Sequence, residues 1–374
     1  MLYSKTGKYY SHDFEFQNIN KLEDVDYSQQ VTFYHHPYDS LQHGVKLYDC
    51  LDHANWEYLR NNFNCKLIHD SNSETFEIYL VNDIVKTIRD RTISPMQLEV
   101  IVMDENHKRF LETQLLKQGI KGVNISVDNY LFRSVEIPDT TVPVTDKFSA
   151  LSRNYRVWRL HVYAELAKRR LLDYFNYSFH NISPYVENPV PETIEKMVAD
   201  LIDTNFGEIT TGVTRWLSAC PHDLKIANNV RNKWSNVTYE TIQSADFHLL
   251  IETHYDQKEY VSQDKNYSRD FAPSSITEKA YKPIACATPF IAFATPNWLE
   301  DLRALGFKTY APYINEDYDK ETDSNKRLNM IVAEIERICS LDETAYKELV
   351  KNCKLIAEEN LQILKSKKNA QKNI

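Results

Sequence analysis

The chain of 374 residues is 42% hydrophobic and 26% charged, which is ordinary for a folded protein, and it is long enough for two domains with separate cores. Its formal net charge of −9 argues against a protein that coats nucleic acid through bulk electrostatics, although a local basic groove remains compatible with it. With only 7 Gly, the sequence contains neither the glycine-rich dinucleotide fingerprint nor the P-loop pattern, which counts against both classes of nucleotide-binding enzyme.

The first part of the chain reads as mixed α/β. Its pattern predicts strands at 66–70, 97–103 and 122–127 and a helix over 105–117 with leucines on one face. Strands and helices that alternate with short connections predict a parallel sheet. The segment 137–147 has two Pro, three Thr and no helical periodicity, so we expect it to be a linker.

A second α/β pattern is clearest between residues 245 and 310. It predicts strands at 245–252, 289–294 and 307–310, a helix from about Thr277, and a helix over 298–305 that is capped by Gly306. Such units place ligands at the carboxyl ends of their strands, where Glu252 and residues 274–279 fall. From Asp342 to about Ser366 the pattern predicts an amphipathic surface helix with a solvated basic end.

Cysteine spacing and hydropathy limit the cofactor and the compartment. The six Cys form no Cys-x-x-Cys pair, and no Cys/His group has zinc-ligand spacing. The first residues lack an apolar signal core, and no run of about 18 apolar residues occurs. We therefore expect no bound metal, no membrane span and a cytoplasmic location.

The helix predicted from about Thr277 carries the first group of candidate residues. Ser275 followed three residues later by Glu278 fits a capping box, which is a purely structural explanation of Glu278. Lys279 places a cation in the first helical turn, where the helix dipole disfavours it unless an anion is bound. A bound diphosphate would compensate Lys279, and the adjacent carboxylate can accept hydrogen bonds from ribose hydroxyls.

Three arginines crowd the start of another predicted helix, which begins at about Tyr155. They are Arg153, Arg156 and Arg159. Any one of them is more commonly a surface partner of nearby acids. Three together at a helix start favour phosphate binding, for which the guanidinium group is well suited.

These segments resemble the donor-binding region of the α-1,3-fucosyltransferase family. Residues 247–256 match an apolar strand that ends in Glu, and residues 274–293 match a Thr-Glu-Lys helix start followed by a strand that begins with Pro. Residues 151–166 are similar to the Ser-Asn and Arg element that precedes them in that family. Thr253 stands where the family has Asn, and the Gly expected before the Pro strand is Thr288 or absent.

A second resemblance is to uncharacterised phage and bacterial glycosyltransferase-like proteins. It rests on Glu278-Lys279, Pro289-Phe290-Ile291 and the series from Leu305 to Thr309, and it continues through residues 315–323. Together the two resemblances imply the two-lobed GT-B fold, with Rossmann-like lobes at 1–145 and 146–345 and a C-terminal helix and basic tail at 346–374. They also imply the cytoplasm of a bacterial or virus-infected cell.

The family resemblance assigns roles by match. Lys279 and either Arg153 or Arg159 would contact the donor diphosphate, Glu278 would contact the ribose, and Glu252 and Thr277 occupy the family's positions at the strand end and the helix start. The donor would be a GDP- or UDP-linked sugar, held by the C-terminal lobe as a co-substrate, with no further cofactor.

A general base of the first lobe is also implied, because a carboxylate of that lobe deprotonates the acceptor hydroxyl in the resembled family. Asp70 and Glu74, just after the strand at 66–70, are the candidates, although a solvated loop acid is the more common role for either one. His35 and His36 are further possibilities.

The reaction expected is an inverting, metal-independent transfer. Residues 317–319, Asp-Tyr-Asp, can be read as the acidic metal motif of the other glycosyltransferase fold, but a solvated turn explains this charged stretch more simply. Because position 286 is Cys, no pair of Glu residues with the spacing of retaining enzymes begins at Glu278. We expect a glycan acceptor; the alternatives are a hydroxymethylated base in phage-type DNA, or a non-catalytic nucleotide-sugar-binding protein.

Overall fold

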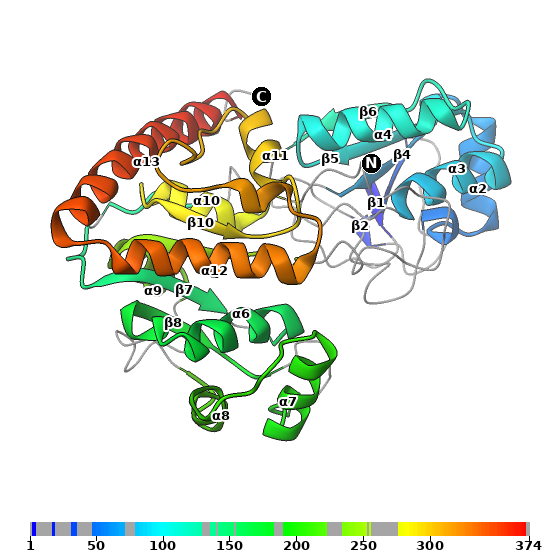
Figure 1. Ribbon diagram of the computed structural model, residues 1–374. Coiled ribbons are helices and arrows are strands. Elements are labelled where there is room, and N and C mark those ends of the chain that lie inside the picture. The colour runs from blue at the N-terminus through cyan, green and yellow to red at the C-terminus, as the bar shows by residue number, and fades with distance from the viewer. Residues whose placement is uncertain are drawn as a thin grey trace. The chain divides into compact units, whose positions relative to one another are not determined.

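The computed structural model describes residues 2–4, 17–18, 31–35, 47–71, 79–128, 135–139, 141–152, 155–182, 190–222, 234–252, 254–255 and 276–371. They form two compact units, one with strands β1 to β6 and one with strands β7 to β10 (Figure 1). Each unit is a parallel sheet with helices, so the mixed α/β class predicted from the sequence is confirmed. In the described part of the chain, no helix combines the length and apolarity needed to cross a membrane.

The sheet of the first unit has the order β2-β1-β3-β4-β5-β6, and every neighbouring pair is parallel. Its strands are β1 (Leu2–Ser4), β2 (Gln17–Asn18), β3 (Thr32–His35), β4 (Lys66–Asp70), β5 (Leu98–Val102) and β6 (Asn124–Val127). The helices are η2 (Leu47–Asp49), α2 (His53–Asn61), α3 (Tyr79–Arg91), η3 (Pro95–Gln97) and α4 (Glu105–Lys117). The predicted strands at 66–70, 97–103 and 122–127 and the predicted helix at 105–117 are all present.

The core of the first unit lies on one face of this sheet. Phe33, Leu67 and Leu98 are paired in register across β3, β4 and β5, and all three are completely buried. Val81 and Ile84 of α3 are buried in the same cluster. Burying each large apolar side chain contributes about 1.5–3 kcal/mol, so this face holds the strands and the helix together.

The sheet of the second unit has the order β10-β9-β7-β8 and is also parallel throughout. Its strands are β7 (Asp146–Ser152), β8 (Phe175–Phe179), β9 (Ala245–Ile251) and β10 (Phe290–Phe293). The helices are α6 (Val157–Lys168), η4 (Leu171–Tyr174), α7 (Ile194–Asp203), α8 (Thr211–Ser218), α9 (Trp234–Gln243), α10 (Glu278–Ala285), α11 (Trp298–Ala304), η7 (Asp317–Lys320), α12 (Ser324–Ser340) and α13 (Glu343–Gln371). Phe148 of β7 stacks on Phe175 and Phe247 of the flanking strands, with ring centroids 4.9 and 5.5 Å apart.

The strand order reverses between β7 and β9. The chain leaves β7 through α6 toward β8 on one side, and it leaves β9 through α10 toward β10 on the other. Because such crossovers are right-handed, α6 and α10 lie on opposite faces of the sheet. The loops that follow β7 and β9 therefore diverge at the carboxyl edge, which is where open α/β sheets bind ligands.

The strand predicted at 307–310 is wrong, because this segment has no regular structure. Gly306 does end α11 as predicted: its φ is 90°, and its N–H donates to the carbonyl of Arg303 at 2.8 Å. Beyond it, side chains satisfy the backbone in place of a neighbouring strand. The fully buried Asn360 of α13 accepts from the Lys308 N–H at 2.8 Å and donates to the Lys308 carbonyl at 2.9 Å.

The expected linker at 137–147 belongs to the second unit rather than to a boundary between lobes. The described residues 137–139 and 141–145 form no helix or strand before β7 begins at Asp146. The two residues that precede position 137 are held by contacts with the rest of the unit. Val135 is buried, its carbonyl accepts from Lys368 of α13, and the Glu136 N–H donates to the Tyr239 hydroxyl at 3.0 Å. The C-terminal helix is also part of this unit, since α13 packs against α10.

Candidate functional site

The carboxyl end of β9 and the start of α10 are joined by one buried carboxylate. Glu252, directly after β9, is only 4% exposed. Its Oε1 accepts from the backbone N–H of Thr277 at 3.2 Å, and the Thr277 hydroxyl lies 2.8 Å from Oε2. Thr277 is also the N-cap of α10, since its hydroxyl accepts from the Lys279 N–H at 3.3 Å. The helix therefore begins at Glu278, with Thr277 as its cap. The sequence predicted Ser275 as the cap, and this residue lies outside the described residues.

Lys279 occupies the centre of this group. Its Nζ is 3.2 Å from the Thr277 hydroxyl, 3.2 Å from Glu278 Oε1 and 3.7 Å from Glu252 Oε2. The Lys279 side chain is 25% exposed and that of Glu278 is 42% exposed, so both reach solvent. Although burial opposes ionisation, Lys279 and then Lys282 lower the pKa of Glu278. The start of α10 thus combines two cations with one accessible carboxylate.

Arg159 follows β7, the strand on the other side of the point where the strand order reverses from β9. It lies in the first turn of α6 and is 6% exposed. Burial and then the neighbouring Arg156 lower its pKa, while Glu252 and Glu278 act in the opposite direction. These two carboxylates are therefore close enough to Arg159 to stabilise its charge.

The arginine-rich segment differs from the prediction in two respects. The helix begins at Val157, with Arg156 as an N-cap that makes no side-chain capping bond, and Arg153 lies outside the described residues. The helix is also buried on all sides from Arg159 to Leu166 rather than along one face. Of the residues predicted to bind the donor, the structure brings together Arg159, Glu252, Thr277, Glu278 and Lys279.

The sequence alone did not indicate the residue that holds the loops after β9 and β10. Arg327 of α12 is 1% exposed, and its guanidinium donates to the carbonyls of Ala294, Glu321 and Tyr255. It therefore connects the segments that follow β9 and β10. A single Arg in an amphipathic helix carries no sequence signal for this role.

In the first unit, Asp70 ends β4 and is 4% exposed. It accepts a hydrogen bond from the hydroxyl of Tyr34 in the adjacent strand β3. Asp70 is therefore a buried, hydrogen-bonded carboxylate rather than a solvated loop acid. Glu74 and His36 lie outside the described residues.

His35 is the other candidate at this edge. It pairs in register with His69 of β4, and the Nδ1 atoms of the two buried rings are 2.9 Å apart. One ring must donate and the other accept in such a contact. After β5, Asp104 and His107 form another buried pair, with 2.7 Å between Asp104 Oδ1 and His107 Nδ1. Polar residues thus follow β3, β4 and β5 at one edge of the sheet.

The Asp-Tyr-Asp motif at 317–319 is not a solvated turn. Asp319 is 5% exposed and accepts from the N–H groups of Leu299 and Glu300 at 2.9 and 3.3 Å, which caps α11. Burial raises the pKa of Asp319 to about 6. Its role is structural, and no group of three or more His, Cys, Asp or Glu in the described part of the chain has the arrangement of a metal site.

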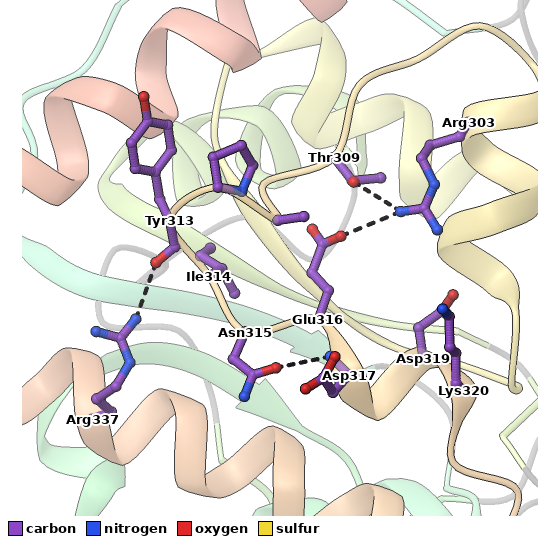
Figure 2. A pocket seen from close by; sticks show the side chains of 12 residues that line it. Arg303, Thr309, Tyr313, Ile314, Asn315, Glu316, Asp317, Asp319, Lys320 and Arg337 are labelled. Atoms are coloured by element: carbon purple, nitrogen blue, oxygen red, sulfur yellow. Dashed lines mark hydrogen bonds and ion pairs between the residues drawn. The ribbon is translucent and has the colours of Figure 1, made fainter.

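A cavity of about 690 Å³ lies beside this motif, and Figure 2 shows the side chains that line it. Arg303 donates to the Thr309 hydroxyl at 2.9 Å and lies 3.3 Å from Glu316 Oε2, and Arg337 donates to the carbonyl of Tyr313 at 3.2 Å. These polar groups hold the loop after α11 in place. None of the residues predicted to bind the donor lines this cavity.

Comparison with known proteins gives little further information. No protein-family model matches the chain, and no curated protein matches it. Among solved structures, a chain of the crystal structure of the GtfA/B complex aligns with 91% of this chain at 12% sequence identity and a TM-score of 0.38. The alignment spans 58% of that longer chain. A likeness at this TM-score and identity carries no information on function.

Proposed function

We propose that the chain is a glycosyltransferase that moves a sugar from a nucleotide-diphosphate sugar to a hydroxyl acceptor. The observation that carries this proposal is the ion pair of Lys279 with the buried Glu252, at 3.7 Å, beside the reversal of strand order in the second unit. Arg159 is a second cation, whose charge the carboxylate of Glu252 favours. Two cations, next to the positive end of the α10 dipole, are suited to a diphosphate at that edge. The resemblance to α-1,3-fucosyltransferases at these same residues favours this ligand over other anions.

The diphosphate is the leaving group of the proposed reaction. Lys279 and Arg159 would stabilise the negative charge that develops on it as the glycosidic bond breaks, and this requires no metal ion. Glu278, whose side chain reaches solvent beside Lys279, would accept hydrogen bonds from the ribose. In the first unit, Asp70 would take the proton of the acceptor hydroxyl, whose oxygen would bond to the anomeric carbon on the side opposite the departing diphosphate. This single displacement would invert that carbon. We propose a glycan as the acceptor.

Calorimetric titration with GDP, UDP, ADP and CMP tests the donor half of the proposal without knowledge of the acceptor. We expect one of the diphosphates to bind and Lys279→Met to weaken its binding about 10- to 100-fold, because a hydrogen bond to a charged group contributes about 1.5–3 kcal/mol. Lys347→Met is the matched control, since Lys347 is 72% exposed and pairs with Glu343 on α13.

Binding of none of the four nucleotides by the wild-type protein would exclude the proposed function. Equal affinity of the Lys279→Met variant and the wild-type protein would remove Lys279 from the phosphate site. Acceptor identity is then addressed by gel shift at two salt concentrations, because binding to DNA weakens steeply as salt rises and binding to a neutral glycan does not.

A further inference from the structure

We infer that Glu252 is a positioning residue, which orders Lys279 and the start of α10 into a site that binds the diphosphate group independently of the nucleoside. The inference rests on the proposed function and assigns a different task to each of the two acids of the donor site. Glu252 acts through Lys279, whereas Glu278 contacts the ligand. Glu278 also pairs with Lys279 at 3.2 Å, but its side chain is 42% exposed, and an exposed ion pair orders its partner only weakly.

The hydrogen bonds of Glu252 point to this division. The Thr277 N–H occupies its Oε1 at 3.2 Å, and the Thr277 hydroxyl lies between both oxygens, at 3.1 and 2.8 Å. The Glu252 side chain is 3% exposed, against 42% for Glu278. Both Glu252 oxygens already accept from Thr277, so the more exposed Glu278 is the carboxylate better placed to meet a ribose hydroxyl.

The charges around Glu252 give it a second task. Lys279 Nζ lies 3.7 Å from Glu252 Oε2, and Arg159 is a buried cation whose charge Glu252 stabilises. Glu252 therefore keeps Lys279 at the carboxyl edge before any ligand arrives, which lowers the cost of ordering this side chain on binding.

Glu252→Gln separates the two roles, because glutamine keeps an oxygen that accepts from Thr277 but removes the charge. The probes are inorganic pyrophosphate, which has neither ribose nor base, and the nucleoside diphosphate that binds best in the panel above. We expect Glu252→Gln to weaken both ligands by the same factor, about tenfold, when measured by calorimetry on protein shown to be folded by circular dichroism. Glu278→Gln is the contrasting variant, and it is expected to weaken the nucleoside diphosphate while leaving pyrophosphate within about twofold.

Thr277 provides an independent test that leaves the charge of Glu252 in place. Thr277→Val removes the hydroxyl that holds the carboxylate, and it should weaken both ligands as Glu252→Gln does. Thr277→Ser restores the hydroxyl and should restore both affinities to within about twofold of the wild-type values. Circular dichroism at the titration temperature must show both variants to be folded, which separates loss of the hydroxyl from a general loss of folded protein.

Several results would overturn the inference. Loss of nucleoside diphosphate binding alone in Glu252→Gln would make Glu252 a ribose contact, and an unchanged or tighter affinity for both ligands would show that it does not order Lys279. If the wild-type protein binds the nucleoside diphosphate but not pyrophosphate, no preformed diphosphate site exists. If the wild-type protein binds neither ligand, the proposed function fails together with the inference.

Discussion

The hydroxyl of Thr277 lies 2.8 Å from Glu252 Oε2, so the first turn of α10 is fixed to the end of β9. The backbone N–H of Thr277 donates to the other oxygen at 3.2 Å. A helix of eight residues is marginal on its own, because nucleation is costly and few hydrogen bonds offset it. The contact therefore sets where α10 begins and which way its first N–H groups point.

Replacement of this cap should lower stability. Thr277→Val removes the N-cap acceptor for Lys279 and one donor to the buried Glu252, and we expect a loss of about 1–2 kcal/mol in the free energy of unfolding. Thr277→Ser should stay within about 0.5 kcal/mol of the wild-type protein. Urea denaturation measures both, and equal stability of the Val and Ser variants would show that the hydroxyl does not cap the helix.

Asn360→Ala tests the side chain that takes the place of the expected strand. Both backbone groups of Lys308 lose their hydrogen-bond partner in this variant, and each such hydrogen bond contributes about 0.5–1.5 kcal/mol. We expect a loss of about 1–3 kcal/mol in the free energy of unfolding. Asn352→Ala on the same helix is the control, with an expected change within about 0.5 kcal/mol. Similar stabilities for the two variants would contradict the assigned role of Asn360.

Asp319 should make stability depend on pH. Burial raises its pKa to about 6, above the value of about 3.9 for an unfolded chain. Between these values the folded protein binds a proton that the unfolded chain lacks, so the free energy of unfolding falls as pH rises from about 4 to about 6. Asp319→Asn should remove up to about 3 kcal/mol of this fall.

Denaturation at several pH values between 4 and 7 measures this effect. Asp317→Asn, a change at an exposed neighbour, is the control and should keep the pH dependence of the wild-type protein. Glu316, whose pKa burial also raises, is present in all three proteins. Parallel pH profiles for wild-type protein and Asp319→Asn would show that Asp319 is not the titrating group.

Asp70→Asn should separate catalysis from donor binding. A general base contributes about 10²- to 10⁴-fold to a rate, so we expect turnover to fall at least 100-fold. Nucleoside diphosphate affinity should stay within about twofold, because the residues proposed to bind the donor belong to the second unit. Asp90→Asn, at a 57% exposed position of the same unit as Asp70, is the control for turnover. Turnover equal to that of the wild-type protein would exclude Asp70 as the base.

The strands and helices with clear periodicity could be predicted from the sequence. This holds for β4, β5, β9, β10, α4, α11 and α13, where apolar residues recur at a strand or helix period. The group Glu252, Thr277 and Lys279 could also be predicted, because it lies at strand and helix ends that the sequence marks. Its function remains a prediction.

The central strand β7 and the neighbouring β8 could not be predicted in the same way. β7 contains Ser149 and Ser152, both buried, and its polarity is compensated only in the fold, where Ser149 Oγ lies 2.9 Å from His248 Nδ1. The same reason explains the error at 307–310 and the burial of Asp319. In each case a polar group has its partner in a residue distant in the sequence, as the Lys308 backbone has in Asn360, and no local pattern records that contact.

Release of nucleoside diphosphate from a panel of GDP- and UDP-sugars tests the central claim most directly. The wild-type protein should consume one of these donors, slowly with water or faster with its acceptor. Lys279→Met should consume it at least tenfold more slowly, while Lys347→Met matches the wild-type rate. Consumption of no donor, or an equal rate for Lys279→Met, would contradict the assignment of this edge of the second unit as the site of sugar transfer.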